Sequence, residues 1–314
     1  MKDIIEQLKI NSNVPIDSLN ENTSDDIAVT IDLIGSLINS KYNDSLSYQI
    51  ADVVPLTGSF GKIYASTKKK NSNDMEIISK DVNTNIKTIK TGFTQEVVQD
   101  MKSMFNKAAK TYVQSVVKGL SAQDENRTLI NLLDSQSDIK PALTIVDSNS
   151  FESVLHQLSK KVSESVIEMN RSTYKTLDSF CILPKDFAAA VLGSFTFMSE
   201  GKEKNLFVGR VGRTDYYINP FPNTASQFTD DFDIDYEIED TSIPNYAYVG
   251  LKSGVIGQSS LIFSPYIYES QYITDPDTGE TILIIRNRYA ISTTPLHRPL
   301  QNDSLLHKFE LIEG

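Results

Sequence analysis

The chain has 314 residues, 39% of them hydrophobic and 23% charged, and its formal net charge is −11. Because contacts to phosphate need clustered Lys and Arg, this balance argues against a dedicated nucleic-acid-binding protein. The length predicts about two domains or one elongated domain. No apolar run approaches the ~20 residues of a membrane span, and the N-terminus lacks the apolar core of a secretory signal, so we expect no membrane partner.

The N-terminal residues 1–25 are polar and rich in Asn, Ser and Asp, with one short apolar patch at Ile4, Ile5 and Leu8. This composition predicts an arm that becomes ordered only against a partner. The following segment, 26–37, has apolar residues at helical spacing and predicts a short helix.

Residues 50–93 predict an extended hairpin. The segment IADVVPLTGSFGKIYA reads as a strand, a Pro-Leu-Thr-Gly turn and a second strand that leads into a Lys-rich tip. We expect strands over 60–67 and 84–92, with a polar segment between them. Because an isolated two-stranded ribbon is only marginally stable in water, this hairpin is predicted to lie on another surface. Its candidate contact residues are Lys68, Lys69, Lys70 and Glu76.

A long helix is predicted over 94–120. Its apolar positions recur at about 3.6 residues and keep one face over roughly seven turns. The residues expected to face the core are Val97, Met101, Phe105, Tyr112 and Val116.

Helices and strands alternate irregularly in the rest of the chain. We predict helices over 151–166 and 184–192, and strands over 179–183, 206–211 and 215–219. From Tyr246 onward the sequence is β-rich, with a hairpin around Asp275-Pro276-Asp277-Thr278-Gly279. The pattern lacks the βαβ regularity of a doubly wound sheet, so the predicted fold class is α+β.

Motifs for chemistry are weak throughout. The single cysteine, Cys181, excludes an internal disulfide and is predicted to be a buried apolar side chain in a reduced protein. Thr57-Gly58-Ser59-Phe60-Gly61-Lys62 has the wrong spacing for a phosphate-binding loop, and Gly209 to Arg213 reads as a tight turn between strands. The three histidines are dispersed, so no hydrolytic or metal-binding set is predicted.

One acidic cluster, Asp231 to Glu239, alternates with apolar residues. Alternation on a strand puts Asp231, Asp233 and Asp235 on one face, where they are weak candidates for binding Ca²⁺. A solvated strand whose charge discourages edge-to-edge pairing is the competing interpretation. We therefore predict no cofactor, no assigned metal site and no enzymatic activity.

Several segments resemble, in the same order, the family of the T-even phage major head protein. They are VVPLTGSFGKIYA, the helix at 94–120, FESVLHQLSKKV, SFCILPKDFAAAVLGS, LFVGRVGRTDYYINPF, YAYVGLKSGVIGQSSLIFSPYIY, IIRNRYAISTTPL and HKFELIEG. The resemblance implies a Hong Kong-type capsid fold. It divides the chain into an N-terminal arm (1–45), a strand and extended hairpin loop (46–93), a peripheral domain with a spine helix (94–144), an axial domain (145–250) and a β-rich return to the peripheral domain (251–314).

The function implied by this resemblance is that of the major capsid protein of a tailed phage. Such a subunit assembles with its own copies into hexamers and a shell, with scaffold, portal and decoration proteins as further partners. The shell encloses DNA without sequence-specific binding. The resemblance also implies synthesis in the host cytoplasm and a final place in the virion. An encapsulin-like compartment and a tail or baseplate structural protein are the alternatives.

Overall fold

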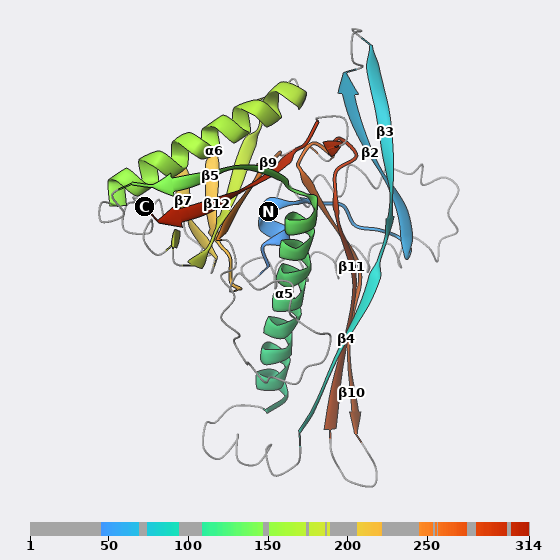
Figure 1. The fold of residues 1–314 in the computed structure, drawn as a ribbon. Helices are drawn as coiled ribbons and strands as arrows, with labels where there is room; N and C mark the ends of the chain where they lie inside the picture. The colour runs from blue at the N-terminus through green and yellow to red at the C-terminus, as the bar shows by residue number, and fades with distance from the viewer. Residues whose placement is uncertain are drawn as a thin grey trace.

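The computed structural model describes residues 45–68, 74–93, 109–146, 151–173, 176–185, 187–188, 206–221, 245–253, 255, 257–274, 281–299 and 303–313. These residues form three sheets and two long helices (Figure 1). A six-stranded sheet and helix α6 lie on one side, the long helix α5 runs beside a narrow four-stranded sheet, and a two-stranded hairpin extends from that sheet. Within this part of the chain, no helix is long and apolar enough to span a membrane.

The six-stranded sheet has the order β5-β12-β9-β6-β8-β7. Its strands are β5 (Asp138–Ile145), β6 (Asp178–Leu183), β7 (Phe207–Val211), β8 (Thr214–Ile218), β9 (Tyr246–Lys252) and β12 (Leu306–Glu313). The pair β7–β8 is a hairpin whose turn contains Gly212 at φ +60°, as the Gly-rich motif predicted. A mixture of parallel and antiparallel pairs confirms the α+β class.

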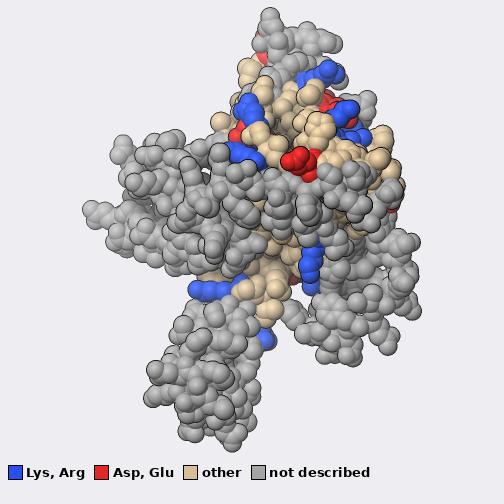
Figure 2. Space-filling model, turned by 90° about the vertical axis from the view of Figure 1, so that its left-hand side faces the viewer, with Lys and Arg blue, Asp and Glu red and all other residues tan. Residues whose placement is uncertain are grey.

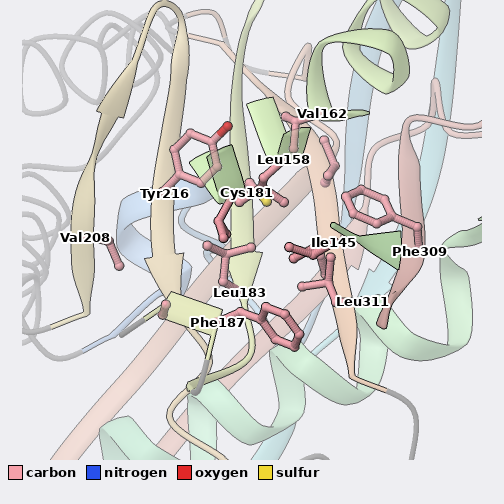
Figure 3. Packing of buried hydrophobic residues seen from close by; sticks show 14 of the residues in the cluster. Ile145, Leu158, Val162, Cys181, Leu183, Phe187, Val208, Tyr216, Phe309 and Leu311 are labelled. Atoms are coloured by element: carbon pink, nitrogen blue, oxygen red, sulfur yellow. The ribbon is translucent and has the colours of Figure 1, made fainter. Parts of the chain in front are cut away.

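One face of this sheet is covered by α6 (Phe151–Thr173), which confirms and lengthens the predicted helix. Val154, Leu158, Val162 and Met169 recur at helical spacing and are all buried. They pack on alternate residues of the strands, including the buried Cys181, and form the larger core of the molecule (Figure 3). Burial raises the pKa of the Cys181 thiol well above its usual range, so it behaves as a small apolar side chain.

The opposite face of the sheet packs against the end of α5 (Ala109–Gln136). Leu129, Ile130 and Leu133 on the helix meet a second buried cluster from β6, β8, β9 and β12. The short helix α3 (Ser47–Ile50) completes this cluster with Leu46 and Ile50. The helix α5 therefore joins the two large sheets, because its other side faces the four-stranded sheet (Figure 1).

The four-stranded sheet has the order β1-β10-β11-β4. Its strands are β1 (Asp52–Val53), β10 (Leu261–Thr274), β11 (Thr281–Thr293) and β4 (Asn85–Phe93). The long pair β10–β11 confirms the hairpin expected in the C-terminal region.

The two-stranded sheet is the β2–β3 hairpin, formed by β2 (Phe60–Lys68) and β3 (Met75–Asn83). The sequence analysis predicted a polar segment between two strands at 60–67 and 84–92. In the structure most of that segment is β3, which pairs with β2, whereas β4 pairs with β11. The reason is that Val82 is the one buried residue of β3, so the apolar residues of this strand do not alternate with polar ones as they do in a half-buried strand.

One other expectation differs from the structure. The helix predicted to end at 120 continues to Gln136, since its later turns use buried polar residues, Ser121, Glu125 and Asn126, as well as apolar ones. The strands of the C-terminal segment divide between two sheets, with β12 inserted between β5 and β9 because Leu306, Phe309 and Leu311 are buried there. The helix expected over 26–37 lies outside the described residues.

Candidate assembly surfaces

The β2–β3 hairpin has two unlike faces. Alternation places Ile63, Ala65 and Val82 on the inner face, where they are buried. Ile63 and Val82 contact Leu56 and residues of β10 and β11 in a small cluster of their own. This cluster anchors the lower half of the hairpin to the body.

The outer face of the hairpin carries four exposed apolar side chains among polar ones. Phe60, Tyr64, Met75 and Ile77 have 56%, 59%, 65% and 75% of their surface accessible. Register pairs Ser66 with Ile77 and puts Met75 opposite the backbone of Lys68, so Met75 and Ile77 share one face with the Lys62–Asp81 ion pair, whose atoms are 3.8 Å apart. We name these four apolar residues the outer row. Single exposed apolar residues are ordinary, but a row of four on a two-stranded ribbon is typical of a surface that binds a partner.

The hairpin meets the body at a narrow junction. Thr84, between β3 and β4, donates from its backbone N–H and from its hydroxyl to the carbonyl oxygen of Ser59, at 2.9 and 3.2 Å. Ser59 immediately precedes β2. The two chain segments that connect the hairpin to the body are thus tied together at a single point, and neither β2 nor β3 joins another sheet by backbone pairing among the described residues.

Two further groups of exposed apolar side chains lie elsewhere. Ile86 on β4 and Tyr272 and Ile273 on β10 lie on the long ribbon of the four-stranded sheet. At the edge of the six-stranded sheet, Ile139 and Val146 on and just after β5 and Ile312 on β12 are exposed on the face away from α6. Both groups are candidates for contacts with other copies or other proteins.

Charged side chains are mixed on the face seen in Figure 2. Lys and Arg of the described residues lie among Asp and Glu, and no broad field of either sign is visible among them. One connected set of ion pairs joins β6, β7, β8 and β9: Arg213 to Asp178 at 2.7 Å, Arg210 to Asp215 at 2.7 Å and Lys252 to Asp215 at 3.1 Å. The described part of this surface shows no broad basic field of the kind that nucleic-acid binding requires.

The predicted contact residues are only partly described. Glu76 is exposed on β3, opposite Thr67, and Lys68 ends β2. Lys69, Lys70 and the N-terminal Ile4, Ile5 and Leu8 lie outside the described residues. So do the acidic candidates Asp231, Asp233 and Asp235, and the helix residues Val97, Met101 and Phe105. Tyr112 and Val116 belong to α5, but their side-chain positions are not described.

Sequence reasoning missed the outer row. The signal was present, because the strand beginning at Phe60 has apolar residues on both of its faces: Phe60 and Tyr64 on one, Ile63 and Ala65 on the other. A two-stranded ribbon can bury only one face on its own subunit. Among the described residues, no group of three or more His, Cys, Asp or Glu is arranged to hold a metal ion.

Comparisons with known proteins agree with this architecture. The family described as Major capsid protein Gp23 matches residues 40–308. No curated protein matches the chain. The capsid of cyanophage P-SCSP1u has a TM-score of 0.50 at 9% identity, covering 84% of this chain and 87% of that one.

Two other solved structures have the same fold. The virus-like particle from Pyrococcus furiosus has a TM-score of 0.51 at 13% identity, with 88% of this chain and 98% of that chain covered. The structure described as Microbacterium phage Oxtober96 has a TM-score of 0.51 at 9% identity, with 85% and 91% covered. These likenesses establish the fold, and the family match extends over more than half of the chain. The chain therefore belongs to the Major capsid protein Gp23 family, and its function is that of a tailed-phage major capsid protein.

Proposed function

We propose that this capsid subunit closes its shell by placing the outer row of the β2–β3 hairpin against a neighbouring copy. The observation that carries the proposal is the row itself: Phe60, Tyr64, Met75 and Ile77 are more than half exposed on a ribbon whose other face is covered by the body in its lower half. Covering apolar surface yields roughly 25 cal/mol per Å², so four such side chains supply a substantial association energy.

The arrangement of copies is a closed ring of six, repeated over the shell. Contacts within such a ring are head-to-tail, so the hairpin of one copy meets a different surface on the next. The exposed residues of the long ribbon, Ile86, Tyr272 and Ile273, are candidates for that second surface. Many modest contacts of this kind, joined in a closed shell, produce strong avidity.

The remaining partners follow from the same function. Scaffold, portal and decoration proteins would bind during and after assembly in the host cytoplasm, and the N-terminal patch of Ile4, Ile5 and Leu8 would add a contact between copies. The finished shell encloses DNA in the virion. A net charge of −11 and the mixed surface charges support enclosure without specific binding.

The five-part division of the chain, from the N-terminal arm at 1–45 to the C-terminal segment 251–314, belongs to the same proposal. The family match does not favour an encapsulin-like compartment or a tail or baseplate protein, although the Pyrococcus particle shares the fold. The structural role also leaves no step for a catalytic group, and none is proposed.

The test is a charge substitution in the outer row. Tyr64→Lys combined with Ile77→Glu should leave the subunit folded, because both side chains are exposed, and should abolish shells seen by negative-stain microscopy. Ile167→Lys is the matched control, since Ile167 is 55% exposed but lies alone on α6. Normal shells from the double variant would contradict the proposal, as would equal loss in the control.

A further inference from the structure

Both strands of the β2–β3 hairpin are held at the same place on the body, by two adjacent residues at the end of β11. The Lys80 ammonium on β3 donates to the carbonyl oxygen of Thr293 at 3.1 Å and to its hydroxyl at 2.6 Å. The next residue, Thr294, donates its hydroxyl to the carbonyl oxygen of Gly257 at 2.9 Å. Gly257 in turn lies against β2.

The contact of Gly257 with β2 is close. A Cβ atom at this position would lie 2.7 Å from the carbonyl oxygen of Tyr64 and 3.4 Å from the Cβ atom of Ala65. Gly257 also has φ +80°, which side chains with a Cβ rarely adopt. Glycine is thus the residue that lets the loop before β10 touch the hairpin backbone.

A third interaction fixes this loop from the other side. Ser259 donates its backbone N–H and its hydroxyl to the Asp52 carboxylate, at 3.1 and 2.5 Å. Thr294 donates its backbone N–H to Ser260 at 3.0 Å. The loop 257–260 is therefore attached to β1 and to the end of β11 before it reaches β2.

The contacts of Lys80 and Gly257 lie where a small shift changes the position of the whole hairpin. Besides these contacts, the hairpin is held by the apolar cluster of Ile63 and Val82 and by the Ser59–Thr84 junction described above, which acts as a pivot. At ~3.3 Å per residue, Lys80 lies about 13 Å from Thr84, whereas Met75 at the far end of β3 lies about 30 Å away. A displacement at Lys80 is thus roughly doubled at the tip of the hairpin.

The interaction of Lys80 is unusual for a lysine. Burial lowers the pKa of its ammonium group. Its hydrogen-bond partners within the described part of the chain are both atoms of Thr293, and no carboxylate there forms an ion pair with it. A half-buried cation held by neutral oxygens contributes less to stability than an ion-paired one. We therefore assign Lys80 a role in positioning the hairpin.

We propose that Lys80, Thr293, Thr294 and Gly257 form a clamp that sets the angle of the β2–β3 hairpin relative to the body. These are positioning residues: they do not form the outer row but determine where it points. The inference deepens the proposed function, because an outer row aimed at a fixed angle meets a neighbouring copy in one orientation. Removing the clamp should free the hairpin to tilt about the Ser59–Thr84 pivot while the body stays folded.

The experiment measures the hairpin angle in the full-length chain. Spin labels at Ser66→Cys on β2 and Ser163→Cys on α6 report the distance between hairpin and body by pulsed electron resonance. Both serines are exposed, and the native Cys181 is fully buried and will not react. Labelled chains are diluted with unlabelled ones, so that distances between copies do not contribute.

Lys80→Met removes both hydrogen bonds but keeps most of the apolar stem. We expect a distance distribution roughly twice as wide as in the unmodified clamp, with the unfolding temperature little changed. Thr293→Val removes only the hydroxyl and should broaden the distance distribution less. Lys80→Arg keeps a charged donor, so its distance distribution should stay narrow. Lys62→Met is the matched control for the angle, because Lys62 lies on the outer face of the same hairpin and is not part of the clamp.

An unchanged distribution in folded Lys80→Met would overturn the clamp. If Lys80→Met unfolds, Thr293→Val takes its place as the test. An unchanged distance distribution in Thr293→Val would then overturn the clamp. The readout is independent of shell formation. If the clamp variants leave the hairpin angle unchanged but the outer-row variants block assembly, the clamp is refuted and the proposed function stands. If the outer-row variants form normal shells while the clamp variants broaden the distance distribution, the proposed function alone is refuted.

Discussion

Asn287 on β11 donates a hydrogen bond of 2.6 Å to the carboxylate of Glu125 on α5, and both side chains are almost completely buried. Asn287 also lies 3.3 Å from the hydroxyl of Ser121, one turn earlier on the helix. Nearby, Tyr289 donates to Asp124 at 2.9 Å. The contact between the spine helix and the four-stranded sheet is therefore polar, whereas the contact of the same helix with the six-stranded sheet is built on the apolar residues Leu129, Ile130 and Leu133.

Replacing Asn287 by Leu should destabilise the subunit. The change removes the donor that Asn287 supplies to a buried carboxylate, and the loss of such a partner costs about 1–3 kcal/mol. Urea unfolding monitored by circular dichroism measures the difference. Arg286→Leu is the control, because Arg286 is the exposed neighbour on the same strand. Equal stability of the two variants would show that the buried hydrogen bond contributes nothing.

Two glycines should respond to alanine in opposite directions. At Gly250 on β9, an added Cβ would lie 2.5 Å from the ring of Phe180 and 2.9 Å from Leu306, so Gly250→Ala should cost about 1–3 kcal/mol by overpacking. At Gly119 on α5 an added Cβ would meet no described atom within 4 Å outside the adjacent backbone of its own helix, and Gly119→Ala should stabilise the helix by about 0.5–1 kcal/mol. Calorimetric unfolding temperatures test both, and shifts of the same sign would contradict this packing.

Acidification should weaken the subunit through His307. Burial, followed by the nearby Lys140, lowers the pKa of this imidazole from 6.5 to about 4. The unfolded chain therefore binds a proton more readily than the native one, so the contribution of His307 to stability is complete above pH 6.5 and is lost as pH falls toward 4. The full shift corresponds to roughly 3 kcal/mol.

The measurement compares urea unfolding at pH 7 and pH 5 for the natural chain and for His307→Leu. Stability of the natural chain should fall more steeply than that of the variant. His297 shifts in the same direction, since burial lowers its pKa while its Nδ1 accepts from Leu305 and its Nε2 lies 3.1 Å from the Gln136 carbonyl oxygen. Parallel pH profiles for the two chains would refute the assignment to His307.

Asp52 should lower the stability of the subunit as pH rises, which is opposite to the effect of His307. Burial raises the pKa of its carboxyl group from 3.8 to about 6, even though Ser259 donates two hydrogen bonds to it. The native state then holds a proton that the unfolded chain releases, so this contribution to stability is complete below pH 3.8 and is lost as pH rises through 6. Between pH 4 and pH 7, the free energy of unfolding should therefore fall less in Asp52→Asn than in the natural chain, by roughly 3 kcal/mol at most. A variant that loses stability equally at every pH would contradict this.

The elements that could be predicted from sequence are those whose pattern is set by one neighbour. Val154, Leu158 and Val162 recur at helical spacing because α6 lies on a single sheet face. The strand at 179–183 is apolar from Phe180 to Leu183 because both of its faces are buried. The turn at Gly212 could be predicted because the left-handed conformation favours glycine.

The elements that were missed depend on distant partners or on another copy. The last turns of α5 use Glu125 and Asn126 as buried residues, and their hydrogen-bond partners, Asn287 and the backbone of Leu46, are remote in the chain. The strand β3 has no regular apolar alternation, because Val82 is its one buried residue and Lys80 meets the body through hydrogen bonds. The outer row has no partner within the subunit, so its role could not be inferred before its exposure was known.

Electron cryomicroscopy of the assembled shell tests the central claim most directly. The account predicts rings of six in which Tyr64 and Ile77 of the outer row are buried against a neighbouring copy, with the hairpin at the angle seen in the single chain. A shell in which these side chains face solvent, or a chain that forms only a small dimer without rings, would contradict it.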